Sequence, residues 1–392
     1  MTENKSLKYL IIAMIIFSAT LYYGAYTAGV IAFFMVFAKD PKEIFNLVLK
    51  EKAIIFTIVA LLLSTLFSKV IGYSMLVDGI IIIHFMVYLV IVRWVNSDNI
   101  EAIFKLLNFM AILICLYGIY QYFTGELIIN TSWTDQGAFG ILVRIYSTMR
   151  NPNIFAAYLT FNICYAIAYY IRKKADIYTA INILLASICL ILTYSRGGFI
   201  AFVAAMLVVT IICKEMKPGV YLVVMISLYF GYNHLESTSR TDLSTIAFDS
   251  SSLYRLEIWK ASWGLFKENI VFGGGLGSVS RFLSFSSDKL GGFIVHAHNI
   301  PLHLLAETGL VGFAAFFVLV LTGIKRFMLF WQAHRKSEHS YIAVGFAGAL
   351  TAMLVHGVVD CVYFIPSRSL IFIVYLGLFS AFFHKACNPQ KS

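Results

Sequence analysis

The residues best suited to chemistry lie in a polar stretch that runs from Tyr254 to Gly312. Near its end, His296 and His298 stand two positions apart, and Asn299 follows directly before an apolar run. Histidine accepts and releases a proton near neutral pH, and the positive end of a helix dipole beside it favours the neutral form that acts as a base. The pattern therefore predicts a histidine base in this stretch. Two loop histidines without a partner are the alternative.

Arg196 lies in a short polar break between two apolar runs, residues 193–198. An arginine so close to the membrane core is costly, and it tends to face the helix bundle or a water-filled cavity. Its planar fork grips phosphate or carboxylate through two hydrogen bonds. Arg196 is therefore a candidate phosphate-binding residue, although a side chain that reaches lipid headgroups would leave the same pattern. The glycines that follow, Gly197 and Gly198, allow backbone or ligand to approach closely.

A second candidate arginine, Arg255, belongs to the segment 251–267. Four apolar residues recur there at near-helical spacing, with charges between them: Leu253, Leu256, Trp259 and Leu265. This spacing predicts an amphipathic helix on the outer surface. Arg255 could point from this helix into a cavity, or it could pair with Glu257 or with lipid phosphate.

Two further arginines stand ahead of another predicted helix. Arg144 and Arg150 precede Asn151, Pro152 and Asn153, which is typical of a helix N-terminus with asparagine as the cap. Because a helix N-terminus attracts anions, either arginine could contribute to the same anionic site. An ordinary connection from loop to helix is the alternative.

Other motifs carry little chemistry. The glycine cluster from Gly273 to Gly277 lacks the preceding strand and the following Lys-Ser/Thr of a nucleotide-binding loop, so we interpret it as a flexible turn. The chain contains no DxD, HExxH or GxSxG motif, and we expect chemistry without a metal or a cofactor. None of the six cysteines lies in a long polar loop, which argues against a disulfide framework and against a Cys–His metal site.

Apolar helices must hold these residues in place. The chain has 392 residues, of which 60% are hydrophobic and 13% charged, well away from the balance of a soluble protein. The apolar runs are roughly 15–22 residues long, about the length that crosses a bilayer as a helix. We therefore predict an all-α polytopic membrane protein with about twelve transmembrane helices. Residues 9–38 form a long run interrupted by Tyr22, Tyr23 and Gly24, which favours two short helices, and a single helix there would give eleven. We also expect the first helix to be uncleaved.

The predicted spans divide the chain into five parts. Residues 1–123 are N-terminal transmembrane helices, 124–152 a first extracytoplasmic loop, 153–232 central transmembrane helices, 233–303 a large extracytoplasmic catalytic loop with amphipathic helices, and 304–392 C-terminal transmembrane helices with a cytoplasmic tail. Alternating sides puts 19 of the 30 Lys and Arg residues inside, 15 of them lysine, whereas seven of the 11 outside are arginine. The inner excess follows the positive-inside rule, and we expect both termini in the cytoplasm. The net charge of +10 thus fits a membrane protein and not a nucleic-acid partner.

The order of these elements resembles the O-antigen ligase family of bacterial envelope enzymes, over roughly residues 140–330. The resemblance rests on these motifs: Arg144-x5-Arg150-Asn-Pro-Asn, Ser195-Arg196-Gly197, Arg255-x3-Trp259, the glycine cluster, His298-Asn299 and Glu307-x-Gly309-x2-Gly312. The family usually has Gly-Thr-Phe before its Asn-Pro-Asn, whereas this chain has Ser-Thr-Met-Arg at 147–150. This departure leaves open which of the two arginines, Arg144 or Arg150, is the equivalent one.

The resemblance implies a glycosyltransferase in the bacterial cytoplasmic (inner) membrane, surrounded by membrane lipids and taking part in lipopolysaccharide or other cell-envelope polysaccharide biosynthesis. The donor would be a glycan on an undecaprenyl diphosphate carrier, and the acceptor a hydroxyl of a lipid, glycan or protein on the extracytoplasmic side. The resemblance implies His298 as the functional histidine and Arg196 and Arg255 as the diphosphate-binding residues, without a metal. The resemblance assigns the diphosphate-binding role to Arg144 and Arg150 less directly. The supporting residues are His296, Asn299, Trp259, Glu307 and Asn153.

Other functions fit the same residues. An O-antigen polymerase of the same superfamily has similar motifs, and the sequence does not separate one transfer from a long polymer. A non-enzymatic transporter of lipid-linked oligosaccharide would also place arginines in a membrane cavity, but it usually has internal repeats or charges on several helices. We find no repeat between the two halves of this chain, and the polar residues cluster on one face. A structural partner of an envelope complex offers no reason for the histidine and arginine set.

Overall fold

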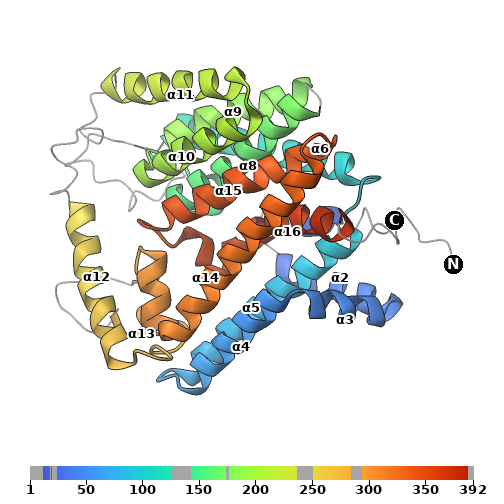
Figure 1. Ribbon diagram of the computed structural model, residues 1–392. Helices are drawn as coiled ribbons and strands as arrows, with labels where there is room; N and C mark the ends of the chain where they lie inside the picture. The colour runs from blue at the N-terminus through green and yellow to red at the C-terminus, as the bar shows by residue number, and fades with distance from the viewer. Residues whose placement is uncertain are drawn as a thin grey trace.

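The computed structural model describes residues 12–17, 19, 24–125, 143–173, 176–235, 250–283 and 294–386. Within these ranges every regular element is helical (Figure 1). The helices before the first large gap are α2 (Ala25–Lys39), α3 (Pro41–Lys50), α4 (Lys52–Leu66), α5 (Ile71–Trp94) and α6 (Ile100–Thr124). The central helices are η3 (Ser147–Met149), α8 (Pro152–Arg172), α9 (Ile177–Leu192), α10 (Arg196–Cys213) and α11 (Met216–Leu235). The C-terminal helices are α12 (Ser250–Glu268), α13 (Ser278–Leu283), α14 (Ile300–His334), α15 (Ser340–His356), η5 (Val362–Phe364) and α16 (Pro366–Ala386).

Six of the described helices are long and apolar enough to cross a bilayer: α5, α6, α8, α10, α14 and most of α16. Four shorter apolar helices accompany them, namely most of α2 together with α4, α9 and α15. The predicted all-α membrane fold is therefore confirmed at this level, whereas the count of twelve spans is not. Helix α2 begins at Ala25, directly after the left-handed Gly24, where we expected an interruption. The five cysteines of the described residues are all buried and free, as expected.

Large parts of the two predicted polar loops lie outside the described residues, namely 126–142, 236–249 and 284–293. The amphipathic helix that we expected at 251–267 corresponds to α12. Its buried face matches the predicted one only in part: Leu265 is buried, but Leu253 and Leu256 are 49% and 43% exposed, and Ile258, which was not in the predicted set, is fully buried. Apolar residues occur on both sides of this helix, so spacing alone did not distinguish the buried side.

Helix α8 is the centre of the described bundle. Nearly all its side chains from Pro152 to Tyr169 are buried, and α9, α10 and α15 pack around it (Figure 1). Helix α15 comes close because it has glycine where α8 carries a large side chain: a Cβ at Gly345 would lie 2.5 Å from the ring of Tyr165. Small residues at such contacts let the backbones of membrane helices approach closely. Close packing matters there, because lipid is as apolar as the side chains and no hydrophobic effect drives the helices together. Helix α8 thus fixes α10 and α15, whose ends carry polar residues.

Amide side chains connect α6, α8 and α9 inside the bundle. Asn182 donates to Asn108 Oδ1 at 2.6 Å and exchanges hydrogen bonds with Asn162 at 2.8 and 3.1 Å, while Asn108 donates to Thr179 at 2.9 Å. All four side chains are buried. Such polar contacts in apolar surroundings favour one arrangement of the helices, because any shift would leave a buried amide without its partner.

The glycine cluster is packed and not a flexible turn as we had interpreted it. Gly275 N donates to Glu307 O at 2.8 Å, and a Cβ at Gly273 would lie 2.4 Å from the carbonyl carbon of Glu307. Gly309 interrupts α14 with φ 61° and ψ −161°, and a Cβ there would lie 2.4 Å from Val271 O. Residues without a Cβ therefore let the loop after α12 dock against the kink in α14. This contact fixes the first turns of α14, which follow the histidine pair.

Candidate active site

His298 lies at the junction between the start of α14 and the end of α15. The next residue, Asn299, caps α14 by accepting a hydrogen bond from Leu302 N at 2.8 Å, as predicted, and its Nδ2 donates to Val358 O at 2.9 Å. His298 itself has φ 53°. This left-handed conformation costs a non-glycine residue about 1–3 kcal/mol, and it persists where neighbouring contacts enforce it, often at a functional site.

Asp360 is the partner of His298, and our sequence interpretation missed it. Its Oδ1 lies 3.1 Å from His298 Nδ1 and accepts a hydrogen bond from Cys361 N at 2.8 Å, while Oδ2 accepts from Asn153 Nδ2 at 2.8 Å. Burial by itself raises the pKa of Asp360, but the charge and hydrogen bond of His298 outweigh it and hold that pKa well below its usual range. Asp360 is therefore an ionised acceptor. It holds the proton of His298 on Nδ1 and leaves Nε2 as the basic nitrogen.

His296 lies beside the same carboxylate. Its Nε2 is 3.7 Å from Asp360 Oδ1, its Nδ1 accepts a hydrogen bond from His298 N at 3.3 Å, and the two imidazole rings meet edge to face with centroids 4.2 Å apart. Burial, and then the charge of His298, lowers the pKa of His296 to about 3. His296 is thus neutral near neutral pH, and it supports His298 by packing against its ring.

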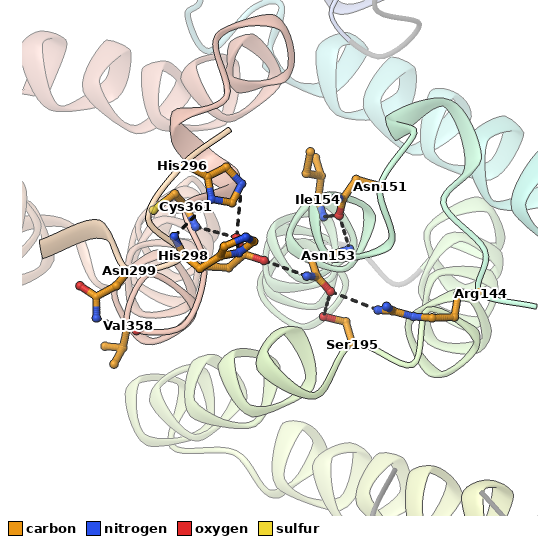
Figure 2. Close-up of polar contacts among 11 residues, drawn as sticks. Arg144, Asn151, Asn153, Ile154, Ser195, His296, His298, Asn299, Val358 and Cys361 are labelled. Carbon is orange, nitrogen blue, oxygen red and sulfur yellow. Dashed lines mark hydrogen bonds and ion pairs between the residues drawn. The ribbon is translucent and has the colours of Figure 1, made fainter. Parts of the chain in front are cut away.

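Asn153 connects Asp360 to the segments that carry the predicted arginines (Figure 2). Its Nδ2 donates to Asp360, whereas its Oδ1 accepts hydrogen bonds from Ser195 Oγ at 2.9 Å and from Arg144 Nη2 at 3.2 Å. Arg144 also donates from Nε to Thr193 O at 2.9 Å. Because donors face acceptors throughout, the amide of Asn153 has a single consistent orientation. Asn153 and Arg144 therefore belong to one hydrogen-bonded network.

Arg196 is the first residue of α10, directly after Ser195. The Ser195 hydroxyl caps this helix by accepting a hydrogen bond from Gly198 N at 3.2 Å, so it serves the cap and the network together. A Cβ at Gly197 would lie 2.8 Å from Val359 Cγ2. The close approach predicted from this glycine is therefore made by the segment after α15. The backbone of Arg196 is thereby fixed next to the network that ends at the carboxylate.

Helix α12 brings Arg255 to the same end of the bundle. Ile258 of this helix packs with Ala297 in a second, smaller hydrophobic core, which places α12 against the histidine segment. Arg255 is half-buried, and its positive charge acts on both His296 and Asp360. Within the described part of the chain it makes no hydrogen bond or ion pair. Its guanidinium is thus available for an anionic ligand near the histidines.

The remaining predicted site residues make other contacts. Arg150 is exposed, with φ 55°, next to Asn151, which caps α8 as predicted. The Nε1 of Trp259 is buried and has no hydrogen-bond partner among the described residues. Glu307 Oε1 accepts a hydrogen bond from Val279 N at 3.2 Å, so this carboxylate holds α13 and does not pair with His298 or His296.

Asp360 could have been found from its place in the sequence. It directly follows the apolar run at 340–358, and from residue 308 to the end of the chain there are just two carboxylates, Glu338 and Asp360. A carboxylate at the end of a membrane helix is costly unless it is paired or takes part in function. The rarity of carboxylates in this part of the chain was therefore a usable signal for Asp360. No pattern in the sequence indicated its partners, His298 and Asn153.

The fold and the site together define a helical membrane protein with a histidine paired to a buried carboxylate and with arginines at one end of its bundle. Comparison with family models then gives a match for residues 181–317 to the model described as O-antigen ligase. Residues 181–317 are therefore similar to the O-antigen ligase family. The match includes Arg196, Arg255 and His298, whereas Arg144 and Asp360 lie outside it. A search of curated proteins gives no match.

Proposed function

We propose that the chain transfers a glycan from an undecaprenyl diphosphate carrier to an acceptor hydroxyl at the extracytoplasmic face of the bacterial cytoplasmic membrane. The family match supports a membrane glycosyltransferase of the O-antigen ligase or polymerase type. The observation that carries the proposal is the pair formed by half-buried His298 and buried Asp360, which Asn153 connects to Ser195, the residue before Arg196. The network thus holds the base and the backbone next to Arg196 at one end of the bundle, which suits a reaction that needs a base and a guanidinium at once.

In this proposal His298 is the base. Its Nε2 takes the proton of the acceptor hydroxyl as the hydroxyl oxygen bonds to the anomeric carbon. Asp360, hydrogen-bonded to Nδ1, stabilises the imidazolium that forms. One positioned base accelerates such a step roughly 10²–10⁴-fold. Attack from the side opposite the leaving group inverts the configuration of the anomeric carbon.

Arg196 and Arg255 hold the leaving diphosphate. The bond between the anomeric carbon and the phosphate oxygen breaks as the new bond forms, and its electron pair stays on the diphosphate. Fixed guanidinium groups stabilise this charge, a task for which many enzymes use a divalent cation. Arg196 also lies at the N-terminus of α10, where backbone N–H groups and the helix dipole favour an anion.

Arg144 is a positioning residue in this proposal. Its Nε and Nη2 donate to Thr193 and Asn153, which connects the turn between α9 and α10 to the start of α8. Of the two arginines that the sequence left open, Arg144 is the one bound into the network around Asp360. We assign the end of the bundle that carries the site to the extracytoplasmic side from the charge distribution. Most lysines lie in the loops assigned to the cytoplasmic side, as the positive-inside rule expects.

The test is glycan transfer in vitro by the full chain purified in detergent, with a defined lipid diphosphate-linked glycan and a defined acceptor. His298→Ala should reduce transfer roughly 10²–10⁴-fold. Arg196→Lys keeps the charge but loses the fork, and should also reduce transfer, by about tenfold or more. His339→Ala, which removes a histidine 3.7 Å from Glu338, is the matched control and should retain activity. Full transfer by correctly inserted His298→Ala would overturn the proposal.

The length of the product distinguishes a ligase from a polymerase. A single added glycan indicates a ligase, and a ladder of products indicates a polymerase. A transporter would move labelled donor across a vesicle membrane without consuming it, and this movement would continue in His298→Ala because no proton is abstracted. That outcome would replace the enzyme by the transporter.

A further inference from the structure

We propose that His296, His298 and Asp360 form a binding site for Zn²⁺ or a similar divalent transition metal, and that the bound ion inhibits transfer. The inhibition rests on the proposed function, whereas binding of the ion does not. One ligand atom from each of these residues lies within 4.8 Å of the other two. This is the one such group of three found among the described residues.

The spacing of the donor atoms fits a small ion. Asp360 Oδ1 lies 3.1 Å from His298 Nδ1 and 3.7 Å from His296 Nε2 (Figure 2). Tetrahedral Zn²⁺ bonds of ~2.0–2.1 Å place neighbouring ligand atoms roughly 3.3 Å apart. These two contacts need shifts of a few tenths of an ångström, and the two nitrogens, which lie within 4.8 Å of each other, close the remaining gap by rotation of the half-buried His298 ring. Three protein ligands leave a fourth position for water.

The donor types select the class of metal. Two imidazole nitrogens and one carboxylate oxygen suit Zn²⁺, Co²⁺ or Ni²⁺, whereas Mg²⁺ and Ca²⁺ prefer sites built mainly from oxygen. The nearby guanidinium of Arg255 opposes any cation, because its charge acts on both His296 and Asp360. We therefore expect a site that an ion occupies reversibly and not a permanent structural metal.

Metal binding and base catalysis exclude each other at His298. In the proposed mechanism Nδ1 carries a proton towards Asp360, and Nε2 is the free base. A metal between Nδ1 and Asp360 Oδ1 replaces that proton. The neutral imidazole then carries its proton on Nε2, which can no longer accept one from a hydroxyl. The bound ion thus removes the base without covering either arginine.

The experiment uses the full chain purified in detergent through a tag that contains no histidine. Co²⁺ is titrated as the probe, because its visible absorption reports the ligand field, and Zn²⁺ then displaces it. We expect one ion per chain, bound at least tenfold more weakly by His296→Gln and by Asp360→Asn. His339→Gln, which alters the histidine–glutamate pair with Glu338, should bind the ion as the wild type does. Thermal unfolding of each variant shows whether it is folded.

The transfer assay tests the inhibition separately. Zn²⁺ at the concentration that fills the site should reduce transfer at least tenfold, and a chelator should restore it, while Mg²⁺ should have no such effect. Equal Co²⁺ binding by the wild type and by folded His296→Gln would overturn the site. Undiminished transfer with the site filled by Zn²⁺ would overturn the inhibition. Normal ion binding by a chain that transfers no glycan would instead refute the proposed function and leave the site standing.

Discussion

Replacing Asp360 by asparagine removes one charge from the site and leaves its volume nearly unchanged. In the native site the carboxylate oxygens accept hydrogen bonds from His298 Nδ1, Cys361 N and Asn153 Nδ2. Asparagine offers one oxygen and one NH₂ group, so at least one of these donors must face another donor. Asn153 cannot turn to relieve the conflict, because its own oxygen accepts from Ser195.

The new amide can take two orientations, and they set the upper and lower limits of the expected fall in transfer rate. If its NH₂ faces His298, the proton of the imidazole moves to Nε2, the base is lost, and transfer falls roughly 10²–10⁴-fold. If its oxygen faces His298, the tautomer is kept but the charge is lost. A hydrogen bond to a charged group contributes about 1.5–3 kcal/mol, against about 0.5–1.5 kcal/mol for a neutral one. That difference corresponds to roughly tenfold in rate, so we expect at least a tenfold fall in kcat.

The assay measures initial rates of glycan transfer over a range of donor concentrations. The kcat of Asp360→Asn should fall at least about tenfold, while the KM for the donor should change by less than about threefold, because Asp360 acts through His298 and touches no phosphate. Glu338→Gln is the matched control, since it neutralises an exposed carboxylate paired with Lys173. It should transfer as the wild type does.

Two results would refute this reasoning. A folded Asp360→Asn with kcat within about twofold of the wild type would show that His298 does not depend on this carboxylate. A raised KM with unchanged kcat would contradict it equally, because it would place Asp360 in donor binding. Thermal unfolding of each variant distinguishes both results from a loss of folded protein.

Two further predictions concern stability, measured as Tm. Gly273→Ala should cost about 1–3 kcal/mol and lower the Tm, because its φ is 70° and the new Cβ would lie 2.4 Å from the backbone of α14. Gly231→Ala is the control and should leave the Tm unchanged, because its new Cβ would meet no atom within 4 Å. Equal unfolding curves for the two variants would refute the prediction for Gly273. Burial raises the pKa of Glu51, but hydrogen bonds from His384 and Arg326 lower it from 4.5 to about 2. A depressed pKa adds stability above about pH 4.5 that is lost as the pH falls towards 2. The Tm should therefore fall between about pH 5 and about pH 3 more steeply in the wild type than in Glu51→Gln, and parallel curves would contradict the prediction.

The helices and their caps could be predicted because their signals are local. Asn151 and Asn299 each precede a proline at the start of an apolar run, and each accepts hydrogen bonds from the first N–H groups of its helix. The part predicted as central transmembrane helices, residues 153–232, contains α8, α9, α10 and most of α11. Apolar runs of this length fold in lipid as helices whatever they pack against, because each backbone group must find its partner within the segment.

The contacts that build the site could not be predicted. Asn153 and Asp360 are 207 positions apart, and no periodic pattern pairs one residue with the other. The buried face of α12 was not predicted for a related reason, since Leu256 and Ile258 are equally apolar and only the neighbouring segments, α13, α14 and the histidine segment, distinguish them. The left-handed backbone of His298 is likewise imposed by its surroundings, because few histidines adopt this conformation on their own.

The order in which the chain is made has a consequence for when the protein becomes active. During synthesis Arg144, Asn153 and Arg196 are added early, and His298 is added 62 residues before Asp360. Until α15 has entered the membrane, the imidazole has no carboxylate to fix its tautomer. In the proposed mechanism, a chain released before that point would lack the carboxylate that fixes its base, so incomplete synthesis would leave an inactive protein.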